Sequence, residues 1–243
     1  MQHTTRPIRK DPLEGKILYV LVMTVLVQFL YPLSVGDSPL FQFGFQIFYM
    51  SLFVAGVYLV SNNRRQMVAL SIASIAWLIV GMIYAFRPDL QWANLLGYLL
   101  IIFFQISLTF VLMGYIFRTK VVNQDVLLAA CAVYLLLGAI FVPVYGIIET
   151  LTYFPEQTTH AFVDGLNEHI EGPFPWQTLV YYSYATLSTL GYGDILPATL
   201  WARSVATFEA IVGVLYTAVI VSRLVGLYAA HEVEEEIVEW ANS

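Results

Sequence analysis

Charged residues are scarce in this sequence of 243 residues: Asp, Glu, Lys and Arg make up 12% of it, and hydrophobic residues make up 59%. Soluble domains carry about 25% charged residues. The mean hydropathy of +0.72 also lies outside the usual range of soluble domains. The composition therefore excludes an ordinary soluble domain and predicts an integral membrane protein, for which we expect no nucleic-acid partner.

Cysteine and catalytic clusters are also missing. The single cysteine, Cys131, leaves no possibility of an intrachain disulfide. The sequence has no cluster of His, Cys and carboxylates at metal-ligand spacing, no serine nucleophile elbow and no phosphate-binding loop. We therefore expect that the chain is not an enzyme and has no cofactor.

Six apolar runs are long enough to cross a bilayer, which takes about 20 residues of helix. They lie at roughly 17–33, 40–60, 67–86, 92–117, 126–148 and 201–227. The first run is short enough to be a signal peptide, but no small-residue cleavage site follows it, so we expect it to be retained. The predicted fold class is an all-α membrane protein with six transmembrane helices per chain.

The positions of lysine and arginine indicate the orientation, because these residues stay on the cytoplasmic side of a membrane. They occur before the first run and after the second and fourth runs, at Arg6, Arg9, Lys10, Lys16, Arg64, Arg65, Arg118 and Lys120. The loop at 149–175 carries five acids and no Lys or Arg, and we expect most of these acids to be solvated. Both termini are therefore predicted to be cytoplasmic, in a multi-pass membrane protein.

A short apolar segment at 176–187 lies between the fifth and sixth runs. Its length of about a dozen residues is typical of a re-entrant helix. Residues 189–194 follow it as TLGYGD, in which Gly191 and Gly193 accept positive φ at little cost. A strand that alternates with left-handed residues turns successive carbonyl oxygens to one side. Irregular backbone at membrane depth is tolerated only beside protein or a water-filled path, so this segment predicts a site for a dehydrated monovalent cation.

The segments TLGYGD and GYGDILPATLWAR, together with Gly213, resemble the potassium channel family of tetrameric pore-loop cation channels, and the pore unit is similar to that of bacterial KcsA-type channels. The resemblance implies that K⁺ binds the Thr189 hydroxyl and the backbone carbonyls of the first four filter residues. The filter comprises Thr189, Leu190, Gly191, Tyr192 and Gly193. One pore loop per chain and a fourfold ring of carbonyls imply a homotetramer.

The same resemblance assigns the surroundings of the filter. The Tyr192 ring is expected to point away from the ions, into a cuff with Tyr181 and Tyr182, and Asp194 is expected at the outer mouth. Many relatives pair this aspartate with a pore-helix carboxylate, but the aligned residue here is Ala185. Inactivation behaviour that relies on such a pair is therefore not carried over to this chain.

The sixth run contains the candidate gate. Gly213 is either a hinge or a point of close helix packing. Glu209 lies one turn before it at hydrocarbon depth, and it is either a titrating gating carboxylate or the acceptor of a structural hydrogen bond. Four residues share one helix face below Gly213 and by the resemblance line the cavity: Val214, Thr217, Ala218 and Val221.

The first four runs show no sign of a voltage sensor. The fourth run lacks the ladder of Arg or Lys at every third position, and the second and third runs contain no acids. The polar residues in these runs are expected to form interhelical hydrogen bonds and not a ligand site. They are Gln28, Gln105, Ser107 and Thr109.

These features divide the chain into a cytoplasmic N-terminal segment (1–16), a four-helix region without voltage-sensor charges (17–120), a pore domain (121–229) and an acidic cytoplasmic tail (230–243). The predicted function is passive conduction of K⁺. Two alternatives stay open: a weakly selective cation channel, and a membrane sensor or assembly protein whose first four helices bind lipid or a partner. The expected partners are copies of the same chain and membrane lipids. The resemblance to bacterial channels implies that the protein lies in the plasma (inner) membrane of a prokaryote.

Overall fold

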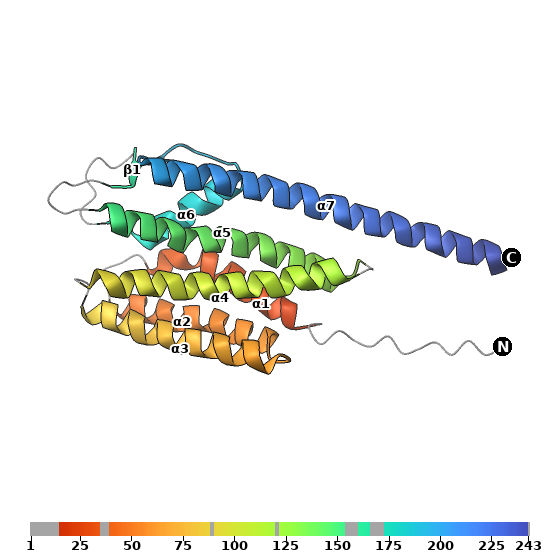
Figure 1. Cartoon of the computed structure of the whole chain (residues 1–243), viewed down its shortest axis with the longest axis horizontal. Helices are drawn as coiled ribbons and strands as arrows, with labels where there is room; N and C mark the ends of the chain where they lie inside the picture. The colour runs from red at the N-terminus through yellow and green to blue at the C-terminus, as the bar shows by residue number, and fades with distance from the viewer. Residues whose placement is uncertain are drawn as a thin grey trace.

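The computed structural model describes residues 15–34, 39–87, 90–119, 122–153, 160–165 and 173–242. Helices form most of this part of the chain (Figure 1). In chain order the elements are α1 (Lys16–Phe29), the 3₁₀ helix η1 (Tyr31–Ser34), α2 (Pro39–Leu59), α3 (Arg64–Phe86), α4 (Gln91–Arg118), α5 (Gln124–Thr152), β1 (Phe162–Asp164), α6 (Trp176–Leu187), β2 (Ile195–Pro197) and α7 (Leu200–Asn242). The predicted helical class is confirmed, with one short pair of strands added to it.

Two of the long helices begin at an asparagine that caps them. The side-chain oxygen of Asn63 accepts a hydrogen bond from the Gln66 amide at 3.5 Å, and that of Asn123 accepts one from the Val126 amide at 2.9 Å. Asparagine is among the preferred N-cap residues, because its side chain satisfies an amide that has no partner within the helix. These caps fix where α3 and α5 start after their short loops.

Among the described residues, four helices are long and apolar enough to cross a membrane: α4, α5, the Arg64–Tyr84 part of α3 and the Leu200–Ala229 part of α7. Helix α1 and the Ile47–Leu59 part of α2 are apolar but shorter. The predicted first run, 17–33, is not a single helix, because α1 ends at Phe29 and Pro32 lies in η1. Proline has no amide hydrogen and clashes with the preceding turn, so it does not continue an α-helix.

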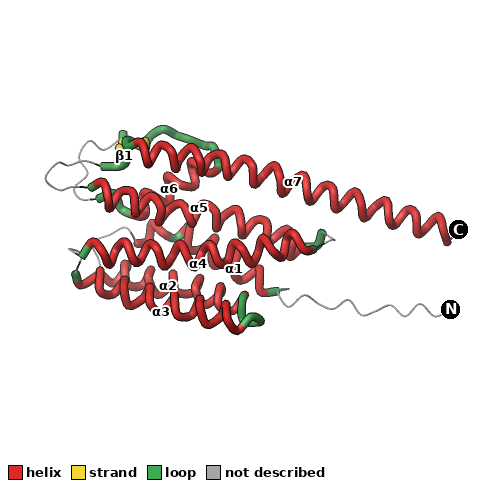
Figure 2. Tube along the Cα trace, in the orientation of Figure 1, coloured by secondary structure: helices red, strands yellow, loops and turns green. Residues whose placement is uncertain are grey.

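Helix α5 lies at the centre of the molecule. Helices α1 and α4 pack on one side of it, and α6 and α7 pack on the other, with α2 and α3 further out (Figures 1 and 2). Helix α1 begins, and α7 ends, toward the same end of the molecule, whereas α6 and the strands lie toward the opposite end. The short helix and its following loop are therefore held between α5 and the long last helix.

The buried side chains form two main clusters along α5. One joins α1, α2, α4 and α5 around large residues such as Phe53, Phe104 and Leu136. The other joins α5, α6, β1 and β2 around Tyr145 and Phe162. The second cluster lies directly behind the segment that the sequence identifies as the filter, so α5 links the four-helix region to the candidate site.

The expectation of interhelical hydrogen bonds holds for Gln105 of α4, which is hydrogen-bonded to Tyr49 of α2, but not for the two hydroxyl residues of α4. The hydroxyl of Ser107 donates to the Phe103 carbonyl of its own helix at 2.7 Å, and the hydroxyl of Thr109 donates to the Gln105 carbonyl at 2.9 Å. Both expectations were wrong, because a hydroxyl in a helix reaches the carbonyl four residues earlier without crossing to a neighbour.

Helix α7 is continuous from Leu200 to Asn242, so the predicted tail at 230–243 is helical up to Asn242. The side chains of that tail lie outside the described residues. In the single chain, 11% of the most apolar stretch of α7 is buried, compared with 61% in α5. Most of the apolar surface of α7 therefore has no contact within its own chain.

Candidate functional site

Helix α6 is followed by a sharp return of the chain. The helix spans Trp176–Leu187, the bounds expected for the re-entrant helix, and it starts after Pro175. At its C-terminal end the carbonyl of Ala185 accepts hydrogen bonds from the amides of Leu190, at 2.9 Å, and Gly191, at 3.1 Å. These bonds occupy a carbonyl at the helix end and turn the following segment back along α6.

The segment after α6 alternates between left-handed and other conformations. Thr189, Gly191 and Gly193 have φ angles of 57°, 54° and 79°, whereas Leu190 and Tyr192 between them do not have positive φ. Thr189 is the only non-glycine residue with positive φ in the described part of the chain. A β-branched residue in this region is an outlier, and such strain of about 1–3 kcal/mol is concentrated at ligand clamps and other functional sites.

The glycine conformations follow from the sequence, but the conformation of Thr189 does not. Glycine is the default residue at positive φ, so Gly191 and Gly193 carry a local signal. Threonine disfavours this region, and only the return of the chain toward Ala185 imposes it. The positive φ angles at 189, 191 and 193 match the alternation that the sequence predicts for a segment whose carbonyl oxygens share one side.

Tyr181 supports the segment from behind. Its ring stacks on that of Tyr192, with centroids 6.3 Å apart and planes 7° apart. Its hydroxyl donates a hydrogen bond to Asp194 Oδ2 at 2.7 Å, and Asp194 Oδ1 accepts from the Ile195 amide at 3.0 Å. The aspartate at the end of the segment is thus held by a tyrosine of α6, although Ala185 offers it no carboxylate.

Tyr182 does not lie beside Tyr192 of its own chain, in contrast to the predicted cuff. Its ring packs edge-on against Tyr145 and Phe162, with centroids 5.1 Å away in both cases. Successive residues of a helix are about 100° apart around its axis, so neighbouring tyrosines face different sides of α6. Tyr182 therefore belongs to the buried cluster between α5 and α6.

A pair of strands joins the outer loop to the end of the filter segment. Strand β1 pairs antiparallel with β2, with Val163 opposite Leu196. The amide of Gly165 donates to the Asp194 carbonyl at 2.7 Å, and the amide of Ala198 donates to the Ala161 carbonyl at 2.8 Å. The backbone that leaves the filter is therefore fixed to residues 161–165.

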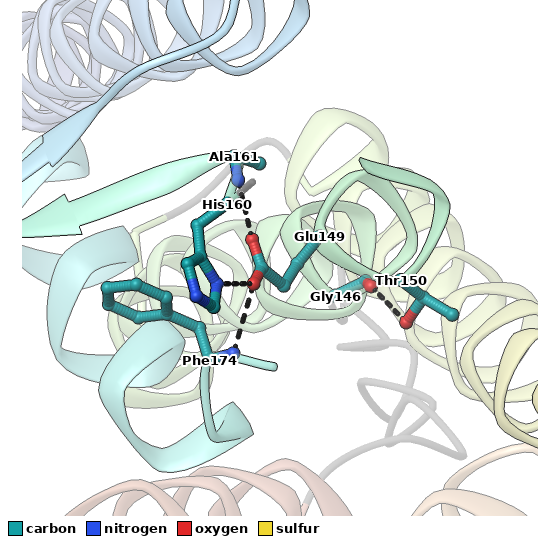
Figure 3. A network of polar contacts seen from close by, with 6 residues as sticks. All are labelled: Gly146, Glu149, Thr150, His160, Ala161 and Phe174. Atoms are coloured by element: carbon teal, nitrogen blue, oxygen red, sulfur yellow. Dashed lines mark hydrogen bonds and ion pairs between the residues drawn. The ribbon is translucent and has the colours of Figure 1, made fainter. Parts of the chain in front are cut away.

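Glu149 anchors both ends of this outer loop (Figure 3). Its side chain is 1% exposed and accepts hydrogen bonds from His160 Nδ1 at 2.8 Å, the Ala161 amide at 2.8 Å and the Phe174 amide at 3.1 Å. Glu149 is therefore not one of the loop acids that are solvated. The sequence held one signal that Glu149 is bound by other groups: it is an acid in the last turn of a helix. The helix dipole disfavours an acid there unless hydrogen-bond donors from elsewhere are present.

Glu209 of α7 is completely buried and connects three helices. One carboxylate oxygen lies 2.5 Å from the Ser183 hydroxyl of α6, and the other accepts a short hydrogen bond from the Tyr145 hydroxyl of α5. The Ser183 hydroxyl also lies 2.8 Å from the Gly138 carbonyl. This geometry fits the interpretation that Glu209 forms structural hydrogen bonds to α5 and α6.

Gly213 provides close contact between α7 and the end of α6. A Cβ atom at this position would overlap the carbonyl oxygen of Leu187. Helix α7 continues without interruption through Gly213. The predicted cavity-lining residues below it are exposed in the single chain; they are Val214, Thr217, Ala218 and Val221.

Arg223 connects the lower part of α7 to the four-helix region. Its guanidinium donates hydrogen bonds to the carbonyls of Ile116 and Phe117 at 3.0 Å and of Thr119 at 3.1 Å. A cation at the C-terminal end of a helix satisfies carbonyls that have no partner within the helix and interacts favourably with the helix dipole. Any movement of this part of α7 is therefore coupled to the end of α4.

The described residues contain no group of three or more His, Cys, Asp or Glu side chains that could hold a metal ion. The ligands that the site offers are backbone carbonyls and the Thr189 hydroxyl. Residues 129–229 match the model of a protein family described as "Ion channel". Comparisons with curated proteins and with solved structures found no match.

Proposed function

We propose that this chain, whose residues 129–229 match the model of the ion channel family, conducts K⁺ passively through a filter formed by residues 189–193. The observation that carries the proposal is the left-handed conformation of Thr189, in register with Gly191 and Gly193. A strained β-branched residue persists only where the surrounding structure requires it. The requirement here is a continuous row of carbonyl oxygens that takes the place of the ion's water shell.

The filter needs other copies of the chain around it. Residues 188–193 are exposed in the single chain, and Tyr192 is 68% exposed. Irregular backbone does not face lipid, because its polar groups would lose their hydrogen bonds. The largely unburied α7 supports the same arrangement. We therefore propose a homotetramer in which four filters face a common axis and Val214, Thr217, Ala218 and Val221 line the path below.

Gating in this proposal does not use a charged fourth helix. The described part of α4 carries one charged residue, Arg118, in its last turn. Arg223 and Gly213 are two of the points at which α7 contacts α4 and α6. Opening would move α7 at these two points, and the plasma membrane of a prokaryote with cytoplasmic termini is the proposed location.

The experiment that tests this function is the reversal potential of the purified chain in planar bilayers under a K⁺ gradient. We expect reversal near the K⁺ equilibrium potential. When Na⁺ replaces part of the K⁺ on one side, the reversal potential should follow the new K⁺ equilibrium potential. Gly191→Ala should abolish the current, because alanine disfavours the φ of 54° at that position. Gly114→Ala is the matched control, since nothing lies within 4 Å of a Cβ added there.

A robust current that reverses near zero when K⁺ on one side faces an equal concentration of Na⁺ on the other would support the alternative of a weakly selective cation channel. The observation in its favour is that Asp194 is held by the Tyr181 hydroxyl and has no pore-helix carboxylate beside it. A Gly191→Ala variant with unchanged current would contradict both forms of the proposal, because the filter would then not be the conducting path.

A further inference from the structure

A cavity of about 550 Å³ lies between the first five helices and the start of α6. We refer to it as the inter-helix cavity. Pockets that hold small molecules have volumes of roughly 300–1,000 Å³. None of the filter residues lines the inter-helix cavity, so it is separate from the conduction site described above.

The inter-helix cavity extends from the outer ends of α4 and α5 toward the middle of α4. Asn94 and Thr150, which are hydrogen-bonded to each other at 3.2 Å, line its outer part, and Gln105 lines its deep part. Asn94 and Gln105 are three helical turns apart on α4, which corresponds to about 16 Å. The cavity is therefore long enough for a molecule with a polar group at its inner end.

Gln105 leaves one polar atom unused at the deep end. The side chain is 1% exposed and is hydrogen-bonded to the Tyr49 hydroxyl. Its Oε1 atom is buried and has no hydrogen-bond partner among the described residues. Buried side-chain oxygens nearly always have a partner, because an unsatisfied one loses the hydrogen bonds that water gave it. The atom is thus in place to accept a hydrogen bond from a molecule in the cavity.

The wall of the inter-helix cavity is rich in aromatic side chains. They come from four helices and from the segment before α6, and they comprise Tyr49, Trp77, Tyr84, Tyr98, Phe174 and Trp176. Aromatic rings pack well against a planar apolar molecule in offset or edge-on arrangements. The wall thus favours a ligand with an aromatic ring over a saturated polar one.

The lining also argues against a charged ligand. No Lys or Arg is among the described residues that line the inter-helix cavity, so an anionic group would have no counter-charge. The one acid in the lining, Glu149, already accepts three hydrogen bonds from His160, Ala161 and Phe174. Its carboxylate is therefore engaged by the outer loop and is not free to pair with a cation.

We propose that the inter-helix cavity binds an uncharged phenol, whose hydroxyl donates a hydrogen bond to Gln105 Oε1 and whose ring packs on the aromatic wall. Such a ligand contacts Trp176, Gln177 and Val180 in the first half of α6 as well as the four-helix region. Binding therefore joins the first four helices to the helix that supports the filter. No ligand site at Gln105 is expected from the sequence. This proposal differs from that expectation.

The test is photolabelling of the full-length purified chain in lipid nanodiscs with a diazirine-bearing phenol. The matched control probe is its methyl ether, which has the same ring but no hydrogen to donate. We expect the phenol to label residues of the inter-helix cavity about tenfold more than the ether, which is the effect of one net hydrogen bond. Competition with 4-ethylphenol and 4-decylphenol shows whether the ligand reaches the cavity from water or from lipid.

Two variants connect the labelling to the cavity. Gln105→Leu removes the acceptor at similar size, so the preference for the phenol over the ether should disappear. Gly97→Leu fills the cavity, since only Val80 lies within 4 Å of a Cβ added at Gly97, and both probes should label less. Gly114→Leu is the control on the same helix, because it lies outside the lining and a Cβ there meets nothing within 4 Å.

Three results would overturn the proposal. Equal labelling by phenol and ether in the wild-type chain would mean that Gln105 does not select the ligand. Labels confined to the lipid-facing residues of α3 and α4 would mean that the cavity holds only water. Stronger competition by phenyltrimethylammonium than by 4-ethylphenol would assign the aromatic wall to a cation. Labelling does not depend on conduction, so its result is independent of the current measurements.

Discussion

The Ser183 hydroxyl lies 2.5 Å from a carboxylate oxygen of Glu209 and 2.8 Å from the Gly138 carbonyl. A hydroxyl has one hydrogen and cannot donate to both acceptors. The contacts are all satisfied if Glu209 is protonated: its O–H then donates to Ser183, and Ser183 donates to Gly138. The Tyr145 hydroxyl donates to the second oxygen of Glu209.

This arrangement predicts different effects for two substitutions of Glu209. Glu209→Gln should retain the fold and the thermal stability, because its amide nitrogen donates to Ser183 and its oxygen accepts from Tyr145. Glu209→Leu should lower the free energy of unfolding by about 1–3 kcal/mol, because it leaves the buried Tyr145 hydroxyl without an acceptor. Thermal unfolding of the purified variants measures both effects.

The same pair of variants separates the two roles considered for Glu209. If the residue only holds the three helices together, open probability against pH should be the same for the wild-type chain and for Glu209→Gln. If the glutamine variant were as unstable as the leucine variant, Glu209 would not be protonated in the folded chain, because the result would mean that its negative charge is required.

Substitution of Glu149 is expected to lower the local stability of the outer loop. Glu149→Ala leaves the buried amides of Ala161 and Phe174 without an acceptor, each at a cost of about 1–3 kcal/mol. Since Ala161 also accepts from Ala198 beyond β2, the substitution should loosen the segment that follows the filter. Hydrogen exchange at 161–165 and 194–198 should become faster.

A control for Glu149 is available in its own network. His160→Ala removes one of the three donors and leaves both amides bonded, so exchange at 194–198 should change little. Equal acceleration in both variants would mean that the histidine, and not the two amides, holds the loop.

Much of the site could be predicted because its signals are local. The bounds of α6 follow from a short apolar segment, and the conformations of Gly191 and Gly193 follow from their lack of a side chain. The extents of α4 and α5 agree with their apolar runs to within a few residues. Such features depend on neighbours in sequence.

The features that could not be predicted depend on contacts between distant segments. The burial of Glu149 requires residues 160–174 to fold back on the end of α5. The position of Tyr182 is set by Tyr145 and Phe162, and the unpaired oxygen of Gln105 by the packing of five helices around it. No local pattern specifies these contacts.

A substitution at Gly213 can show whether this glycine is needed for close packing of α7 on α6 or as a hinge in α7. Gly213→Ala forces the added methyl against the Leu187 carbonyl, and backbone cannot move aside as a flexible side chain can. We expect a loss of about 1–3 kcal/mol in the free energy of unfolding, as for other overpacked sites. Gly226→Ala in the same helix has nothing within 4 Å of its added Cβ and should be neutral or stabilising by up to about 1 kcal/mol.

The comparison of these two alanines decides what the glycine does. If Gly213 were needed only as a hinge, its alanine variant would be as stable as Gly226→Ala and would differ from it only in open probability. Reduced thermal stability of Gly213→Ala alone would show that the glycine is needed for close contact with α6.

Thr189 predicts an opposition between stability and function. Its φ of 57° is unfavourable for a β-branched residue, so Thr189→Gly should raise the free energy of unfolding by roughly 1 kcal/mol. The same change removes the hydroxyl that is proposed to bind K⁺ and frees the backbone, so selectivity for K⁺ over Na⁺ should fall.

Thr189→Ser isolates the strain, because it keeps the hydroxyl and removes the β-branch. It should recover most of the selectivity with part of the added stability, as measured by reversal potential and thermal unfolding. A glycine variant that is less stable than the wild-type chain would show that the segment is not strained at Thr189, and the main structural support for the proposed filter would be lost.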